Sequence, residues 1–514
     1  MAKIEEAGKR RSLLFHLSIV SGILLILALF TVLFLPSLLL KLWANRSFDE
    51  PDALFIKLEA REARVSPFLN GFTLKGVKAH TAASGDNPAA IAEIRAEKLQ
   101  RLPFLKLLCG LAGPDVSGIL QDGSLVILDL RQNEAFLGNL SGVALKRLEL
   151  QGVDVPKGEE SSFGDLRAAL VELESFAASP GPDASISVPF LSLKGLKDGY
   201  LESLSLRGVS LEYGGFISTE IGELSLDRSD LRLPAENSGE EGAALALIGS
   251  FFKNTKNLDL KNFQLKIMGS DILRLFELDY ENDLSQTPAR ASLKIPAGEI
   301  GAAALFMAGE AGPEAEKFFG ALEFPLAFAL EHAYFRSDAA ENLSLSFQSP
   351  ENLSLRLIQD FAPDPGWTEG GPFPGSLLEK ASLGTGTLDF EDSGFLPRLN
   401  ALLAEECRES GSPCSAAEAL EAFLRSRDPS GILDLEAFLR DLKTPGKTPS
   451  HASLRWEPAP GFPRLALEQA DNDPDYPISG ESLLNRRVYA IFDQLNLKMS
   501  VDGGPDAALK LYPF

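Results

Sequence analysis

The stretch Phe72-Thr73-Leu74-Lys75-Gly76-Val77-Lys78-Ala79 carries the pattern that decides the fold. Apolar and polar residues alternate up to Gly76 and then alternate again, one residue out of phase. Alternation with a period of two is typical of a β-strand with one apolar face. Because a one-residue slip would turn the later apolar side chains to the other face, we expect a bulge or bend at the glycine, which tolerates a positive φ.

The same pattern returns along the chain, so strands dominate the prediction. It is found at 148–155 and 204–211, in a shorter form at 191–196, and at 258–265, where Asn262 stands in the place of glycine. The glycines are unevenly spaced, which excludes a solenoid of fixed period. We predict an α+β fold that is mostly antiparallel β, with an N-terminal transmembrane helix followed by a curved or groove-like β region with a few short helices.

A long uncharged segment precedes the first strand pattern. No charged side chain occurs from Ser12 to Leu40, and this run is longer than the roughly 20 apolar residues that cross a bilayer. It is also too long for the apolar core of a cleaved signal peptide. The basic run Lys9-Arg10-Arg11 precedes it, which favours a cytoplasmic N-terminus. We therefore predict a cytoplasmic tail at 1–12 and a transmembrane anchor at 13–42.

Charge and cysteine content narrow the function classes. The formal net charge of −23 argues against nucleic acid as a partner and against close electrostatic docking on an anionic membrane surface. Cys407 and Cys414 bracket a turn-like segment between helical patterns at 395–407 and 415–425. Their spacing fits neither a redox CxxC pair nor a zinc knuckle. We predict a structural disulfide between them, with two free thiols as the alternative.

No enzymatic or metal-binding motif is recognisable in the sequence. Asp471, Asp473 and Asp475 have the spacing of the first calcium ligands of an EF-hand loop, but Tyr476 stands where that loop needs glycine. The segment Gly384-Thr385-Gly386 lacks the third glycine of a nucleotide-binding loop, and we expect it to ease a bend in the sheet. We therefore predict a protein that is not an enzyme and that binds no cofactor and no metal.

Composition also suggests where the chain that follows the predicted anchor divides into domains. The stretch 234–242 is rich in acidic residues, Gly and Pro, and it is the best candidate for a domain boundary. We predict one β domain over 45–235 and a second β-rich domain over 243–514, with a helical pair near 395–425. Ser415, followed by Glu418 three residues later, predicts a capping box at the start of the second helix of that pair.

Together with the anchor, the segment that runs from Val65-Ser66-Pro67-Phe68 through Gly76-Val77 to 119–125 resembles the opening module of the AsmA-like family of bacterial envelope proteins. A basic and apolar helix or turn at 102–111 lies between its strands. The resemblance, which covers about residues 10–235, implies a single-pass bacterial inner-membrane protein with a cytoplasmic N-terminus and a periplasmic β groove lined by apolar side chains. The type II secretion protein N family has a similar layout of anchor and β region.

These observations lead to two functional interpretations. The first is envelope maintenance by handling lipid or other amphipathic material along an apolar β face, because such a face needs a cover that helices or bound lipid can supply. The second is a non-enzymatic scaffold of a secretion or envelope assembly. The partners implied are the inner membrane, lipid, and envelope or secretion proteins. The candidate groove residues are the apolar positions of the three full patterns: Phe72, Leu74, Val77, Leu148, Leu150, Val153, Leu204, Leu206, Val209 and Leu211.

Overall fold

The computed structural model divides the chain into two compact units, which are described separately below. Unit 1 comprises Met1–Gly214 with Asp230–Arg232, and unit 2 comprises Gly215–Ser229 with Leu233–Phe514. The structure describes residues 35–45, 57–66, 68–80, 87–108, 123–132, 141–153, 167–181, 183–230, 255–283, 288–304, 320–337, 341–362, 382–410, 415–426, 433–443, 449–458, 471–473 and 483–510.

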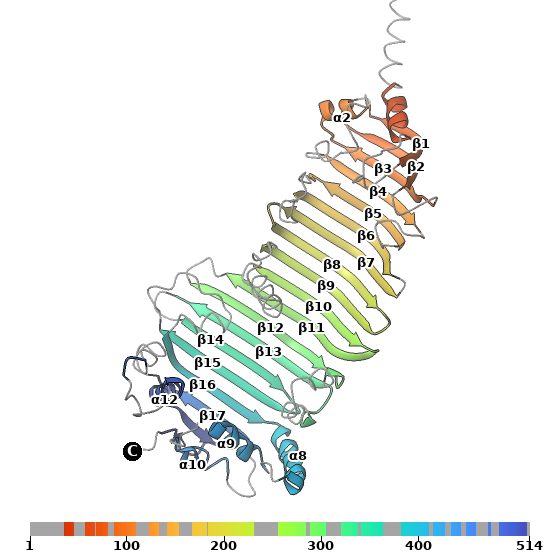
Figure 1. The fold of residues 1–514 in the computed structure, drawn as a ribbon. Helices are drawn as coiled ribbons and strands as arrows, with labels where there is room; N and C mark the ends of the chain where they lie inside the picture. The colour runs from red at the N-terminus through yellow and green to blue at the C-terminus, as the bar shows by residue number, and fades with distance from the viewer. Residues whose placement is uncertain are drawn as a thin grey trace, which may run out of the picture. The chain divides into compact units, whose positions relative to one another are not determined.

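Unit 1 is built on an antiparallel sheet whose strands follow one another in chain order (Figure 1). The first strand, β1 (Lys57–Val65), pairs with β2 (Phe72–His80), and each later strand pairs with its predecessor as far as β8. The other strands are β3 (Ala89–Glu97), β4 (Ser124–Gln132), β5 (Ser141–Gln151), β6 (Ala168–Gly181), β7 (Ala184–Leu196) and β8 (Tyr200–Tyr213).

Two helical segments accompany this sheet. One spans 35–44, and the other is α2 (Arg101–Leu108). Side chains four residues apart on one face of segment 35–45 bond to the backbone of β1, so the helix covers the free edge of that strand. These bonds are Val65 N to Ser37 Oγ at 3.0 Å, Lys41 Nζ to Arg61 O at 3.2 Å, and Ala60 N to Asn45 Oδ1 at 3.0 Å.

The predicted anchor lies mostly outside the described residues. Within the described part of the chain, no helix is both long enough and apolar enough to cross a bilayer. Residues 13–34 of the predicted anchor are not described. The remainder, 35–42, packs against the sheet of unit 1, where the side chain of Leu40 is fully buried.

Unit 2 has the same arrangement of sequential antiparallel pairs, from β9 (Ile217–Asp230) onward. The later strands are β10 (Asn257–Ile267), β11 (Ser270–Asp283), β12 (Ala289–Ile300), β13 (Leu326–Arg336), β14 (Glu341–Ser349), β15 (Leu353–Ala362), β16 (Ser382–Asp392), β17 (His451–Trp456), β18 (Lys498–Val501) and β19 (Ala507–Ala508). A mostly antiparallel β fold with a few short helices is therefore confirmed.

The acidic stretch 234–242, our candidate for a domain boundary, separates two strands that pair with each other. β9 and β10 run antiparallel in one register, from Asn257 opposite Asp227 to Ile267 opposite Ile217. Both strands belong to unit 2, and the division between the units falls at Gly214. The composition of 234–242 therefore marks a long connection between neighbouring strands.

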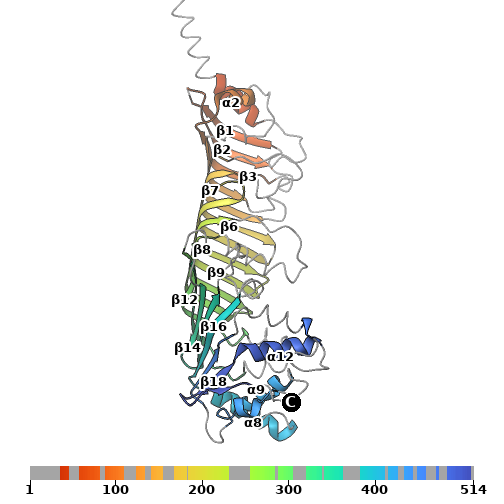
Figure 2. The same cartoon turned by 90° about the vertical axis from the view of Figure 1, so that its left-hand side faces the viewer.

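The helices of unit 2 follow and interrupt its last strands. The predicted helical pair is present as α8 (Phe395–Ser410) and α9 (Ala416–Ser426), and the amide of Glu418 donates to Ser415 Oγ at 3.3 Å, as a capping box requires. Two further helices are α10 (Leu435–Phe438) and α12 (Leu483–Leu495). Figure 2 shows α8, α9 and α12 on one side of the nearby strands.

Candidate functional site

In every strand of unit 1, the alternation of apolar and polar residues shifts by one residue at a single position. These positions lie side by side and form one row across the sheet. In β2 and β8 the row residue is a glycine with positive φ, Gly76 at 56° and Gly208 at 66°. In β4 and β6 it is Asp129 at 50° and Ser175 at 54°. The pairing register is the same on both sides of the row, so two paired strands shift their side-chain alternation at opposed residues. Of the bulge or bend that we expected at the glycine, the bulge is wrong, because no extra residue is absorbed in either strand.

The coordinated turn keeps the apolar side chains of unit 1 on one face, which we call the apolar face. On one side of the row, directly opposed apolar residues continue from strand to strand without a gap. Cross-strand pairs of this kind are the unit of sheet stabilisation. One series is Ala63, Leu74, Ile94, Ile127, Leu148, Leu173, Leu191 and Leu206, and a parallel series of the same length is Val65, Phe72, Ala96, Leu125, Leu150, Val171, Leu193 and Leu204.

At the β1–β3 end, helices close the apolar face. Leu74 and Val77 are each 1% exposed and share a hydrophobic cluster with Leu40 and with residues of α2. The ring of Phe72 stacks on that of Phe104 in α2, with centroids 5.7 Å apart. These three groove candidates therefore lie in a closed core, and we do not retain Phe72, Leu74 and Val77 as ligand-facing residues.

The remaining groove candidates lie on β5 and β8 or just after β5, where the apolar face is half-buried. Leu204 packs in a cluster with Leu193 and Val153 that contains no residue of a described helix. Leu211 is 39% exposed. The closed cluster extends into this region, because Val143 and Leu145 of β5 are buried in it and Leu148 packs against it, whereas Leu204 and Leu206 on β8 keep accessible surface. The half-buried candidates are Leu148, Leu150, Val153, Leu204, Leu206 and Val209.

Unit 2 carries an apolar series of its own. Its directly opposed residues are Leu226, Leu258, Tyr280, Leu293, His332, Leu345, Leu357, Leu388, Leu454 and Met499. Helices cover the part of this face on the later strands: Phe395 of α8 clusters with Leu353, and Ala490 of α12 packs against Leu383. This covered part is a conventional core of helices on a sheet.

Titratable groups on the strands of unit 2 are adapted to burial. Desolvation lowers the pKa of His332, which lies in the apolar series, so the imidazole is favoured in its neutral form. Tyr334 donates its hydroxyl to Glu341 Oε1 at 2.6 Å, and both residues are buried. Burial raises the pKa of Glu341. This effect is larger than the lowering of the pKa by the hydrogen bond from Tyr334. Neither group belongs to a catalytic constellation among the described residues.

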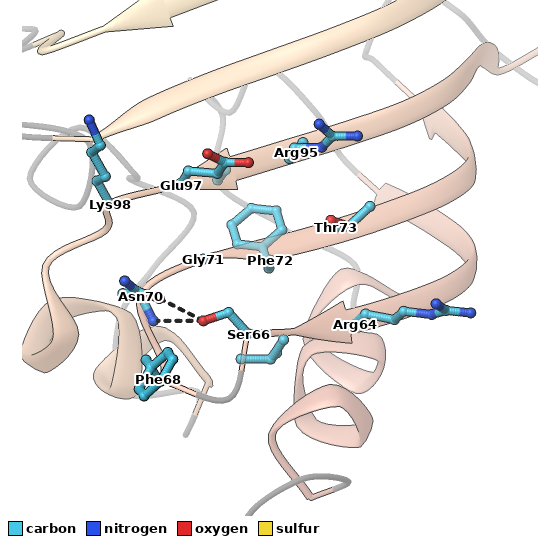
Figure 3. A pocket seen from close by; sticks show the side chains of 12 residues that line it. Arg64, Ser66, Phe68, Asn70, Gly71, Phe72, Thr73, Arg95, Glu97 and Lys98 are labelled. Atoms are coloured by element: carbon cyan, nitrogen blue, oxygen red, sulfur yellow. Dashed lines mark hydrogen bonds between the residues drawn. The ribbon is translucent and has the colours of Figure 1, made fainter.

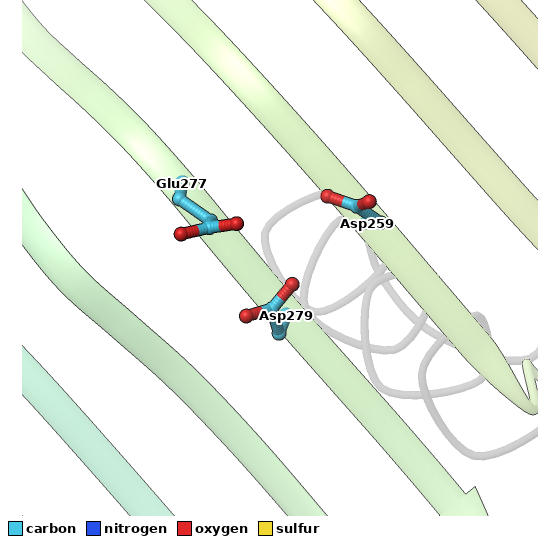
Figure 4. A group of neighbouring side chains, drawn as sticks. All are labelled: Asp259, Glu277 and Asp279. Carbon is cyan, nitrogen blue, oxygen red and sulfur yellow. The ribbon is translucent and has the colours of Figure 1, made fainter.

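Three carboxylates that the sequence analysis did not single out, Asp259, Glu277 and Asp279, gather on β10 and β11 (Figure 4). Their oxygens lie within 4.8 Å of one another. Lys261 forms ion pairs with this cluster, with Nζ 3.0 Å from Asp259 and 3.9 Å from Glu277. Its hydrogen bond to Asp259 raises the pKa of the ammonium group. We interpret the group as a solvated ion-pair cluster on the polar side of these strands.

A cavity of about 410 Å³ lies at the start of unit 1, beside the β1–β2 turn (Figure 3). Arg64, Thr73 and Arg95 occupy directly opposed positions on three neighbouring strands along its wall. Phe68 and Lys98 also line it, and Ser66 Oγ bonds to Asn70 Oδ1 at 2.6 Å within the turn. Basic and aromatic side chains thus meet at this end of the unit, a combination that the alternation of the strands did not indicate.

Two other sequence predictions can be placed. Asp471 forms a two-bond ion pair with Arg487, at 2.6 and 2.7 Å, and Asp475 lies outside the described residues. Cys407, on α8, is disulfide-bonded. Its predicted partner Cys414 lies outside the described residues, so the pairing stays a prediction.

Comparison with known proteins does not assign the chain to a family. No protein-family model matches it, and no curated protein is significantly similar to it in sequence. The apolar face of unit 1, with one closed end and one half-buried end, is therefore the observation from which a function has to be argued.

Proposed function

We propose that this protein binds the acyl chains of lipids, or similar amphipathic molecules, along the apolar face of unit 1 on strands β5 to β8. The observation that carries the proposal is the continuous series of directly opposed apolar residues that ends at Leu206 and remains half-buried there. A sheet that presents a wide apolar face to water is unfavourable without a cover. Bound lipid is a cover that matches such a face in chemistry.

The dimensions of the half-buried region fit this proposal. Neighbouring strands are about 4.8 Å apart, so β5 to β8 span roughly 14 Å across the sheet. One leaflet of a bilayer has an acyl layer of roughly 15 Å, half of the ~30 Å hydrocarbon core. The span of the region is therefore similar to the thickness of the acyl layer of one leaflet, which suits an acyl chain lying across the strands. The leucines and valines in it offer no hydrogen bonds, which suits a hydrocarbon tail.

The cellular setting is proposed on separate grounds. The uncharged run from Ser12 to Leu40 and the resemblance to AsmA-like proteins support an inner-membrane anchor, a periplasmic location and a role in envelope maintenance. A reporter fused after Phe514 tests the topology. It should be active only if it is of a type that works outside the cytoplasm, and activity of a cytoplasm-only reporter would contradict the orientation.

The binding proposal is tested by the lipid content of the full-length protein. Wild-type protein is extracted from membranes, exchanged into a detergent of known composition and analysed for retained lipid by native mass spectrometry. Leu206→Asp should lose that lipid, because a carboxylate on the apolar face opposes contact with hydrocarbon. The matched control is Ser203→Asp on the opposite side of β8, where the new carboxylate faces Lys194 of β7. Equal lipid content in wild type and Leu206→Asp would count against the proposal.

A protein-binding scaffold is the second candidate, and a specific surface favours it. Phe216, Ile217 and Met268 are 51%, 37% and 81% exposed at two neighbouring turns of unit 2, where the amide of Met268 donates to the carbonyl of Phe216. Exposed aromatic and methionine side chains are enriched in protein interfaces. A lipid-free protein that captures one defined partner, and that loses this partner in the Met268→Ser variant, would favour the scaffold.

A further inference from the structure

We infer that the end of unit 1 nearest the uncharged segment docks on the phospholipid headgroup layer of a bilayer, through a surface that we call the interfacial patch. Its members are large apolar side chains that the sheet leaves in the open. They are Leu35, Leu38, Leu42, Phe68 and Leu102, which are 45%, 56%, 62%, 72% and 73% exposed. Exposed apolar groups gathered at one place mark an interaction surface.

The patch residues come from three segments that meet at one end of unit 1. The bond from Val65 N to Ser37 Oγ places the β1–β2 turn, which contains Phe68, beside the first turn of segment 35–45. The amide of Leu99 donates to the carbonyl of Asn70 at 2.8 Å, which brings the start of α2 to the same turn. Figure 3 shows Phe68 on this turn, close to Ser66 and Asn70.

Segment 35–45 is apolar on two opposite sides, and only one of these is buried in the part of the chain that the structure describes. Leu40 and Ala44 are fully buried against the sheet. Leu35, Leu38 and Leu42 follow one another at intervals of three and four residues, so they share the other side of the helix. A helix with apolar residues on two opposite sides needs an apolar environment on both of them. The described residues of unit 1 do not supply the second environment.

Sequence continuity and charge identify a bilayer as that environment. Residues 13–34, which carry no charge, directly precede Leu35. In a chain of net charge −23, residues 57–108 contain nine Lys and Arg against five Asp and Glu. Arg64, Lys98 and Arg101 of this stretch are exposed next to the patch. Leucine and phenylalanine flanked by arginine and lysine are typical of segments that lie at a membrane interface and contact lipid phosphates.

This inference rests on the membrane anchor proposed above, and it goes beyond it. Because segment 35–45 is bonded to the edge of β1, it belongs to the β unit and cannot also lie inside the hydrocarbon core. The crossing would then use residues 13–34, which as a helix span roughly 33 Å at 1.5 Å per residue and still cover a ~30 Å core. The patch gives unit 1 a second attachment, so that β1 keeps a fixed orientation to the bilayer.

The inference is tested by depth-dependent quenching in the full chain. Phe68→Cys carries an environment-sensitive dye, and Cys109→Ser removes a competing thiol. The protein is reconstituted in vesicles of phosphatidylethanolamine and phosphatidylglycerol that contain lipids with a nitroxide near the headgroup. The matched control is Phe216→Cys, an exposed aromatic position in a turn of unit 2. We expect blue-shifted and quenched emission at position 68, and water-like, unquenched emission at position 216.

The outcomes separate the patch from the anchor. Vesicle flotation and carbonate extraction report the anchor independently of the dye. If the protein stays in the membrane while the dye at 68 behaves like the dye at 216, the anchor stands and the patch is refuted. If the protein is extracted, the anchor and the inference fall together. Reversing two charges, Lys98→Glu with Arg101→Glu, should reduce quenching at 68, and unchanged quenching would overturn the role given to the basic side chains.

Discussion

The sharpest test of the apolar face compares the same substitution at two positions of one cross-strand series. Leu74 and Leu206 both belong to the series of directly opposed residues that crosses unit 1. Leu74 is 1% exposed beneath the helices, whereas Leu206 is half-buried opposite Leu191. Replacing each by aspartate asks whether the face is closed at one end and accessible at the other.

The expected magnitudes differ strongly. Full burial of a leucine contributes about 1.5–3 kcal/mol, so Leu206→Asp should remove roughly 1 kcal/mol from a side chain that is only half-buried. For a unit of this size, that corresponds to a fall in Tm of roughly 2–4 °C. Leu74→Asp loses the whole contribution and also buries a carboxyl group without a partner, at a cost of several kcal/mol. Since domains are stable by only about 5–15 kcal/mol, this variant should fold poorly or not at all.

The assay combines thermal unfolding, followed by circular dichroism, with lipid analysis of the purified full-length variants. Leu206→Asp should keep the β spectrum, show a small decrease in Tm and lose its lipid. Leu74→Asp should lose cooperative unfolding. Ser203→Asp, whose carboxylate faces Lys194 on the polar side, should resemble the wild type in both measurements.

Two results would refute the reasoning. If Leu206→Asp unfolds as completely as Leu74→Asp, the face at β8 is sealed in the same way as the face at β2, and accessible surface there cannot hold a ligand. If Leu206→Asp folds normally and retains all of the wild-type lipid, β8 lies outside the path of the ligand. Either result would leave the scaffold function as the better interpretation.

Three further predictions concern the stability of individual features. Gly76→Val should cost about 1–3 kcal/mol in chemical denaturation, because a β-branched residue is forced to a positive φ; its Cβ would also lie 3.2 Å from that of Arg61. Asp129→Gly at the same row should leave stability unchanged or increase it, and a fully stable Gly76→Val would contradict the role of the row. Burial raises the pKa of Glu341 above its ordinary value of 4.5, so the folded state holds this proton more tightly and stability falls as the pH rises through the folded pKa. Glu341→Gln should therefore raise Tm near neutral pH and make no difference below pH 4.5, whereas an equal gain at both would show that titration is not the cause. Cys407 and Cys414 should be joined in peptide maps made without reductant, with a stabilisation of no more than about 3 kcal/mol for so short a loop, and free alkylation of both thiols would exclude the bond.

The period-two alternation was sufficient to predict the sheet, and the glycines showed where its phase changes. Gly76 and Gly208 have the positive φ that the sequence predicted, and so does Asn262 at 53°. Asp129 and Ser175 were missed because they are not glycines. Their signal was present as a three-residue step between apolar positions, as from Ile127 to Leu130. The alignment of these phase changes in one row depends on how the strands pair. Strand pairing is non-local, and the sequence of a single strand does not reveal it.

The division of the apolar face into closed and half-buried parts could not be predicted from the sequence. Leu74 and Leu206 stand in the same local pattern, and what separates them is the packing of segment 35–44 and α2 on one end of the face. Gly152 illustrates a similar limit. It has a positive φ of 57°, yet it follows the last residue of β5. In the repeat at 148–155, the glycine therefore marks the end of a strand and not a change in the phase of its alternation.

The way in which the free edges of the sheet are protected also bears on function. An exposed edge strand can recruit another strand through its free backbone groups. In unit 1, the side chains of Ser37, Lys41 and Asn45 occupy such groups on β1. In unit 2, the chain ends with two short strands, β18 and β19, which offer little backbone for pairing. Since these two edges offer few free backbone groups, the proposed binding on the half-buried apolar face of unit 1 would use contact between side chains and hydrocarbon and not strand addition.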